Sequence, residues 1–262
     1  MRKDVKIVGQ YTDYPNYQSA SELRGRDNIY NIFSDIIEHG IIPRNEILAN
    51  LGLFIKRQDM SRILWMHEIY TKILSVHGVI IEFGVRWGQD LALFENFRGI
   101  YEPFNYNREI IGFDTFEGFQ SLNEKDGSGA AMKEGTLTVS GGYEHILEQI
   151  LDFHESECPI SHVKKFQLVK GDACITAKQY FKDNPHTIVA LAYFDMDIYK
   201  PTYECLKIIN EHVTKGSVLV FDEINNRNWP GETLALKEIF GLSKYAIKRV
   251  PYNPTTSYLI VE

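Results

Sequence analysis

The chain has few cysteines, no long apolar run and no excess of basic residues. Its three cysteines, Cys158, Cys174 and Cys205, are widely spaced, which argues against a disulfide framework and a zinc site and favours the cytosol. We expect no membrane association, because no stretch of about 18 apolar residues occurs and the charged start lacks the apolar core of a secretory signal. The net charge of -7 argues against nucleic acid as a partner.

The 262 residues, 44% hydrophobic and 24% charged, are enough for one large globular domain with an appendage. Residues 1–28 are polar and predict an arm, which is compatible with a homodimer contact. Apolar residues recur at helical spacing between 29 and 76. The sequence therefore predicts an N-terminal arm and helical cap over 1–77, followed by a second domain over 78–262.

After Gly78, short apolar runs alternate with helical patterns. The predicted strands are 79–83, 109–114, 165–170, 187–195 and 217–222, and the predicted helices include 88–98, 173–182, 201–212 and 232–240. This alternation is typical of a Rossmann-like α/β fold with a mostly parallel sheet. Residues 245–250 and 256–262 predict a closing antiparallel hairpin, which makes a seven-stranded sheet. The glycine-rich stretch 118–142 predicts a mobile loop over a site.

Acidic residues stand at or just beyond the ends of four predicted strands. These residues are Asp114, Asp172, Asp195 and Asp222. In open α/β sheets, ligands bind outside the carboxyl ends of the strands. A single Asp at such a place is often a turn or cap residue, but four of them along one edge favour a ligand site.

The first of these turns has the sequence Glu-Phe-Gly-Val-Arg-Trp-Gly at 82–88. Gly84 and Gly88 allow the backbone to approach a ligand closely, because neither has a Cβ atom. A dinucleotide site has a third glycine for the pyrophosphate. That glycine is absent here, and the acid Glu82 ends the strand, so the turn departs from phosphate binding.

Two acids further along favour a nucleoside. Asp114 lies 30 residues after Gly84, where a carboxylate can accept hydrogen bonds from both ribose hydroxyls. Phe116 is a candidate to flank the adenine ring or to pack in the core. Asp172 can accept from the adenine amino group or can cap the helix that follows it, and both readings stay open.

Acidic pairs follow the last two parallel strands, at Asp195-Met196-Asp197 and Asp222-Glu223. Like charges at neighbouring strand ends repel one another. Oxygen ligands of this kind suit Mg²⁺, Mn²⁺ or Ca²⁺. The sequence therefore favours a divalent cation at this edge over the alternative that one pair is simply solvated.

The motifs together resemble those of the macrocin O-methyltransferase (TylF/MycF-type) family. They are Glu-Phe-Gly-Val-x-x-Gly at 82–88, Gly-Phe-Asp-Thr-Phe-Glu-Gly at 112–118, Lys-Gly-Asp at 170–172, Asp-Met-Asp-Ile-Tyr-x-x-Thr-Tyr at 195–203 and Phe-Asp-Glu at 221–223. The resemblance covers about 78–240 and implies a class I methyltransferase that uses S-adenosylmethionine and Mg²⁺ or Mn²⁺ on a sugar hydroxyl. The implied cofactor-binding residues are Glu82, Phe83, Gly84, Gly88, Asp114, Thr115, Phe116, Asp172, Ala173 and Asp195. The implied metal ligands are Asp195, Asp222 and Glu223, and the implied general base is Asp197.

The chain departs from that family where Asp222-Glu223 replaces the usual two aspartates. Glu232 follows as a candidate metal ligand, substrate contact or helix N-terminal acid. The expected acceptor is a nucleotide-sugar for capsule, lipopolysaccharide or natural-product synthesis. Lys133, Lys164, Lys165 and Arg227 are candidates to contact its phosphates. The alternatives are a catechol-type methyltransferase, an NAD-dependent dehydrogenase and a non-catalytic cofactor-binding module.

Overall fold

The computed structural model describes residues 20–128 and 132–262, with side chains from residue 29 onward. Their contacts separate two compact units, one within residues 20–64 and the other within residues 65–262. Most of the predicted polar arm, residues 1–19, lies outside the described residues, as do 129–131 of the predicted mobile loop. No described helix combines the length and the apolar character needed to cross a membrane.

The larger unit is built on a six-stranded sheet, counted over the described residues. Its strands are β1 (Val79–Phe83), β2 (Ile110–Asp114), β3 (Phe166–Lys170), β4 (Val189–Phe194), β5 (Val213–Phe221) and β6 (Ser257–Ile260). Their order is β3-β2-β1-β4-β5-β6, and only the β5–β6 pair is antiparallel. The five predicted parallel strands are thus confirmed. This is the Rossmann-like arrangement that the alternating pattern indicated.

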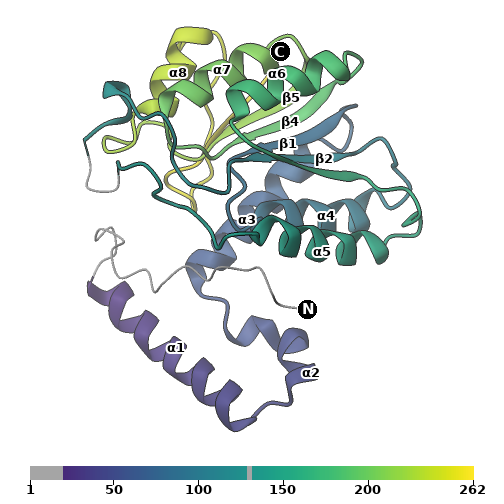
Figure 1. Ribbon diagram of the computed structural model, residues 1–262, viewed down its shortest axis with the longest axis vertical. Coiled ribbons are helices and arrows are strands. Elements are labelled where there is room, and N and C mark those ends of the chain that lie inside the picture. Colours follow the sequence, from purple (N-terminus) through teal and green to yellow (C-terminus); the bar gives the residue numbers. More distant parts are fainter. Residues whose placement is uncertain (1–19, 129–131) are drawn as a thin grey trace. The chain divides into compact units, whose positions relative to one another are not determined.

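Helices cover both faces of this sheet, as Figure 1 shows. The helices of this unit are α4 (Gln89–Tyr101), α5 (Tyr143–Ser156), α6 (Ala173–Asp183), α7 (Tyr199–Ile209) and α8 (Gly231–Ile239), with the end of α3 (Arg57–Lys72) and the short 3-10 turn η2 (Glu124–Asp126). Helices α4 and α5 lie on one face, and α6, α7 and α8 lie on the other.

Each face of the sheet has its own apolar core. The first core joins Phe94, Leu147 and the end of α3 to alternate strand residues such as Ile80. The second joins Ala177, Leu206 and the helices of the opposite layer to the intervening strand residues. All five residues of β1 are buried. A strand that is covered on both faces is a continuous apolar run, which explains why the sequence pattern located β1 and β4 so closely.

The predicted seventh strand is wrong. Within the described residues, 245–250 forms one isolated bridge, Lys248 to Tyr258, and β6 alone pairs with β5. Proline has no backbone N–H and cannot donate to a ladder. Pro251 limits the ladder on the side of the turn, and residues 245–247 carry no strand assignment on the other side. The expected hairpin therefore reduces to one strand and an irregular return.

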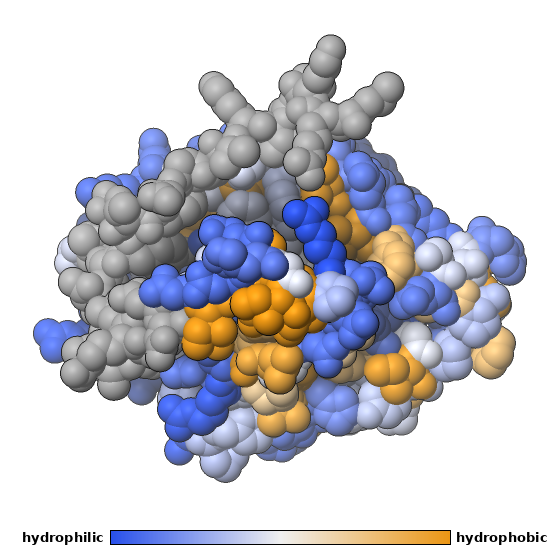
Figure 2. All heavy atoms as spheres, turned by 90° about the horizontal axis from the view of Figure 1, so that it is seen from below, coloured by the Kyte–Doolittle hydropathy of each residue, from blue (hydrophilic) through white to orange (hydrophobic). Residues whose placement is uncertain are grey.

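The smaller unit is helical, as the spacing between 29 and 76 predicted. It contains α1 (Ala20–His39), α2 (Arg44–Ile47), the 3-10 helix η1 (Leu48–Leu53) and the start of α3. Phe33 packs edge-on against Phe54, with ring centroids 4.7 Å apart. Large side chains exposed in this unit are Tyr30, Ile32, Ile41, Leu48, Leu51, Leu53, Met60 and Leu64. Figure 2 shows apolar residues gathered beside strongly hydrophilic ones on the face seen from below.

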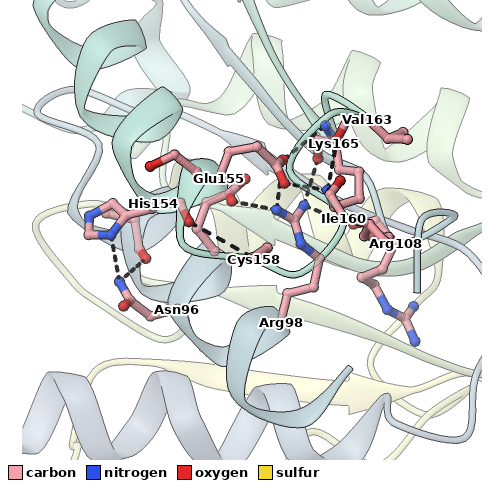
Figure 3. A network of polar contacts seen from close by, with 12 residues as sticks. Asn96, Arg98, Arg108, His154, Glu155, Cys158, Ile160, Val163 and Lys165 are labelled. Atoms are coloured by element: carbon pink, nitrogen blue, oxygen red, sulfur yellow. Dashed lines mark hydrogen bonds and ion pairs between the residues drawn. The ribbon is translucent and has the colours of Figure 1, made fainter. Parts of the chain in front are cut away.

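A buried ionic network joins α4, α5 and the start of β3 (Figure 3). Arg98 donates to Glu95 at 2.5 Å and to Glu155 at 2.9 Å. Glu155 also accepts from the backbone N–H of Lys165 at 3.0 Å and from its ammonium group. Arg98 further donates to the carbonyl oxygen of Arg108, the residue two positions before β2. Because Arg108 and Lys165 precede parallel strands, this network lies at the amino edge of the sheet.

Candidate functional site

The candidate site lies at the carboxyl ends of the parallel strands. The strand order reverses direction between β1 and β4, which are neighbours in space but not in sequence. Such a switch point leaves a crevice between loops that turn away to opposite faces, and ligands of open α/β sheets bind there. The acids that the sequence singled out lie at the last residue of β2 (Asp114) and in the turns after β3, β4 and β5.

The turn after β1 is tightly packed against the end of β4. Gly84 has a φ of 94°, and a Cβ atom at this position would lie 1.9 Å from the carbonyl oxygen of Asp195. The backbone N–H of Asp195 in turn donates to the carbonyl oxygen of Phe83 at 2.8 Å. Gly88 also has a positive φ, and a Cβ atom there would meet the side chain of Leu147. Both glycines are therefore required by the fold itself.

Asp114 ends β2 and holds the neighbouring turn. Its carboxylate accepts from the backbone N–H of Arg86 at 2.7 Å and from that of Phe116 at 2.5 Å. Burial raises the pKa of Asp114 above its usual value, and these backbone donors oppose that effect. A carboxylate has about four acceptor positions, so the contacts with the turn leave room for ribose hydroxyls.

The residues around Asp114 and Asp172 have defined local roles. Thr115 accepts from the backbone N–H of Glu117 and donates to a backbone carbonyl, and Phe116 is buried with a φ of 58°. Asp172 accepts from the backbone N–H of Cys174 at 2.9 Å and is the N-cap of α6, which begins at Ala173. The capping role of Asp172 is thus confirmed, and it does not preclude an adenine contact through the other oxygen.

Glu232 joins the two acidic segments. It lies in the first turn of α8 and is fully buried. One of its carboxylate oxygens accepts from the backbone N–H of Glu223 at 3.0 Å, and the other accepts a longer bond, 3.4 Å, from that of Asp197. Among the three roles that the sequence left open for Glu232, the structure shows the buried helix N-terminal acid, with both acidic turns bonded to it.

The acids of these turns influence one another's ionisation. Burial, followed by the carboxylates of Asp197, Asp222 and Asp195, raises the pKa of Glu232 well above its usual range. Burial and the charge of Asp222 raise the pKa of Glu223 to about 7. The proximity of the two acidic turns follows from their shared hydrogen bonds to Glu232.

Asp222 and Glu223 accept hydrogen bonds from uncharged side chains. Asp222 accepts from the hydroxyl of Tyr193 at 3.1 Å and from that of Thr256 at 3.2 Å. Glu223 accepts from the side-chain amide of Asn226. Over residues 20–128 and 132–262, no group of three or more His, Cys, Asp or Glu side chains is arranged as a metal centre. Mg²⁺ usually takes only one or two protein carboxylates and keeps several waters, so a metal here would not need all three of the predicted ligands.

Two candidate phosphate contacts lie away from this edge. Lys164 and Lys165 directly precede β3, at its amino end. Lys165 is buried in the network of Figure 3, and Lys164 pairs with Glu148 at 2.8 Å. Arg227, in contrast, is exposed in the loop after β5, on the side of the acidic turns. Lys133 is exposed in the segment between β2 and α5.

Asp126 is a site-neighbouring residue that sequence reasoning missed. It is 1% exposed and accepts from the backbone N–H of Tyr199, the first residue of α7. The only local signal was the spacing of Asn123 and Asp126, which forms a capping box. That pattern predicts a turn, but it does not reveal a partner 73 residues away along the chain.

Comparison with known proteins identifies the chain. No family model and no curated protein matches it. The crystal structure of CalS11, a calicheamicin methyltransferase, is 40% identical, with a TM-score of 0.89 over 93% of this chain and 94% of that one. A second, apo structure of CalS11, described as TDP-rhamnose 3'-O-methyltransferase, is 38% identical, with a TM-score of 0.81 over 93% and 96%. The O-methyltransferase NovP shares the fold at 16% identity, with a TM-score of 0.58 over 77% and 79%.

The fold and the acid-lined carboxyl edge thus define a class I S-adenosylmethionine-dependent O-methyltransferase. The identity to CalS11 extends over nearly the whole of both chains. The chain belongs to the macrocin O-methyltransferase (TylF/MycF-type) family of sugar O-methyltransferases.

Proposed function

We propose that this enzyme methylates a hydroxyl group of a nucleotide-activated sugar. The observation that carries the proposal is the 40% identity to CalS11 over 93% of the chain, because CalS11 is a TDP-rhamnose 3'-O-methyltransferase. The nucleoside-diphosphate form of the acceptor is supported by that relative and by the exposed Arg227 beside the acidic turns. Synthesis of a natural product, a capsule or a lipopolysaccharide is the setting in which such sugars are methylated.

S-adenosylmethionine is the proposed methyl donor, bound across the carboxyl ends of β1, β2 and β3. Glu82, Phe83, Gly84 and Gly88 would line its methionine side. Asp114 with Thr115 and Phe116 would hold the ribose, and Asp172 with Ala173 the adenine end. We assign the cofactor-binding domain to 78–262 and the arm and cap to 1–77, with a homodimer contact through the arm.

A divalent cation, Mg²⁺ or Mn²⁺, is the second proposed cofactor. Of the three predicted ligands, Asp195, Asp222 and Glu223, one or two would hold it, with waters as the other ligands. The raised pKa of Glu223, caused by burial and by the charge of Asp222, is the effect expected of neighbouring carboxylates without a cation. A bound divalent cation lowers the pKa of a coordinated hydroxyl. The cytosol is the proposed compartment, where S-adenosylmethionine and nucleotide-sugars are made.

Asp197 is the proposed general base. It is 9% exposed and has a φ of 61°, a conformation that its neighbours must hold in place. Its carboxylate would accept the proton of the sugar hydroxyl as the oxygen attacks the methyl group, and the C–S bond of the sulfonium breaks. General base catalysis contributes about 10²- to 10⁴-fold.

The proposal is tested by methyl-transfer assays with a panel of nucleoside-diphosphate sugars that includes TDP-rhamnose, with Mg²⁺ and with EDTA. We expect turnover of at least one nucleotide-sugar, loss of turnover in EDTA and its return with Mg²⁺. Turnover of catechol alone would assign the enzyme to the alternative acceptor class. Calorimetry with S-adenosylmethionine and with NAD tests the cofactor, and binding of NAD alone would refute it.

Asp197→Asn tests the base. The variant keeps the shape of the side chain but has little basicity, so we expect kcat to fall by about 100-fold or more. Calorimetry should show unchanged S-adenosylmethionine affinity. A variant with near-normal kcat removes Asp197 from this role.

A further inference from the structure

A short turn of the β2–α5 connection is bonded to the start of α7. The turn, Asn123–Gly127, contains η2 and is closed by its own capping box. One carboxylate oxygen of Asp126 accepts from the backbone N–H of Asn123 at 2.7 Å, and the other accepts from that of Tyr199 at 2.5 Å. Because Asp126 is nearly completely buried, these two bonds are shielded from water, and hydrogen bonds to a charged acceptor are about twice as strong as neutral ones.

The bond to Tyr199 has a direct consequence for the proposed base. Asp197 lies two residues before Tyr199, in a turn with a positive φ, and α7 has no side-chain cap at its own N-cap residue, Ile198. The first N–H groups of a helix have no partner within the helix. Asp126 supplies one of these partners from outside, and so fixes where α7 begins relative to β4.

The 197–199 turn is also closely packed against the first residue of α8. A Cβ atom at Gly231 would lie 2.5 Å from the backbone nitrogen of Tyr199 and 2.9 Å from the carbonyl oxygen of Asp197. A Cβ atom at Gly127 would lie 2.8 Å from the carbonyl oxygen of Asn228. The start of α8 is therefore packed against the 197–199 turn, and the loop just before α8 is packed against the 123–127 turn.

We propose that Asp126 is a positioning residue for methyl transfer, which holds the Asp197 turn in its reactive place through the N–H of Tyr199. The inference rests on the proposed function, in which Asp197 is the base. Asp126 itself touches neither substrate nor cofactor in this scheme. Its loss lets the Asp197 turn shift, and a displacement of about 1 Å at a reacting group can lower the rate by about 100-fold.

The adjacent residue provides a matched control. Lys125 also ties the 123–127 turn to the helical layer, with its ammonium 2.7 Å from Glu238 and 3.9 Å from the ring centroid of Tyr199. These contacts are exposed and involve side chains only. Lys125→Ala therefore loosens the same turn without removing the acceptor of the Tyr199 N–H.

The experiment compares Asp126→Asn, Asp126→Ala and Lys125→Ala in the full chain by steady-state kinetics. We expect both Asp126 variants to lower kcat by about tenfold or more, with the KM for S-adenosylmethionine changed by less than about twofold. Lys125→Ala should keep kcat within about twofold of the wild type. The Asn variant preserves side-chain volume and keeps the test valid if the Ala variant fails to fold.

Hydrogen exchange gives a second readout that does not depend on activity. Peptides that contain the Tyr199 amide should exchange faster in the Asp126 variants than in the wild type or Lys125→Ala. The inference is overturned if kcat stays within twofold in Asp126→Ala, if Lys125→Ala loses as much activity, or if exchange at Tyr199 is unchanged. A wild-type protein that methylates no nucleotide-sugar would instead refute the proposed function, and the exchange measurement would still test the Asp126 contact.

Discussion

Glu155→Gln tests whether the buried ionic network stabilises the fold. The change removes a charge from a side chain that is 5% exposed and accepts from Arg98 and from both nitrogens of Lys165. Breaking one partner of a buried ion pair costs about 3–5 kcal/mol. Here Arg98 keeps Glu95 and two carbonyl oxygens, and the ammonium of Lys165 keeps two carbonyl oxygens. We therefore expect a loss near the lower limit, about 3 kcal/mol.

Urea unfolding measures this loss as a lower midpoint with an unchanged m-value. For a protein of this size, about 3 kcal/mol also corresponds to a melting temperature lower by about 6–12 °C. Glu148→Gln is the matched control, because it removes an ion pair with Lys164 in which both side chains are about half exposed. Exposed pairs contribute at most about 1 kcal/mol. Equal destabilisation by the two variants would refute the reasoning from burial.

Three further predictions concern the site. Gly84→Ala places a methyl group against the carbonyl oxygen of Asp195. Calorimetry should therefore show S-adenosylmethionine binding that is at least about tenfold weaker. A variant with wild-type affinity would contradict this packing argument. Glu232→Gln leaves only one acceptor oxygen for the backbone N–H groups of Asp197 and Glu223. We therefore expect kcat to fall by about tenfold or more. An unchanged kcat would show that Glu232 does not hold the two turns. In EDTA, we expect the melting temperature to fall as the pH rises from about 4.5 to 7, and to fall more in the wild type than in Glu223→Gln. The sign follows because the pKa of Glu223 is raised to about 7, so the unfolded chain loses this proton first as the pH rises. Parallel melting curves would show that Glu223 does not titrate in this way.

The sequence predicted the parallel sheet because each central strand is buried on both faces. Such strands are mainly apolar, although β1 also contains the buried acid Glu82, and Gly84, Asp114 and Asp195 mark their carboxyl ends. Local patterns therefore contained the topology of the larger unit. The hairpin prediction failed because residues 245–250 do not alternate between apolar and polar side chains, and they form only the Lys248–Tyr258 bridge.

The sequence located acids at the strand ends but not the hydrogen bonds that connect their turns. The acids at the strand ends were visible in the sequence, and so was the capping alternative for Asp172. The contacts of Glu232 and Asp126 were not, because both accept from backbone N–H groups of distant segments. Backbone donors leave no residue-type signature, so no sequence pattern could specify these partners.

The contact between Gly84 and the Asp195 carbonyl oxygen bears on how relatives of this enzyme are recognised. A glycine that the sheet itself demands would persist in a descendant that had lost its cofactor and its activity. Asp197, in contrast, is the residue whose carboxylate we propose as the general base. Among distant homologues, the glycine motif is therefore a marker of common ancestry. If Asp197 is the base that we propose, its replacement is what would distinguish an inactive paralogue from a working enzyme.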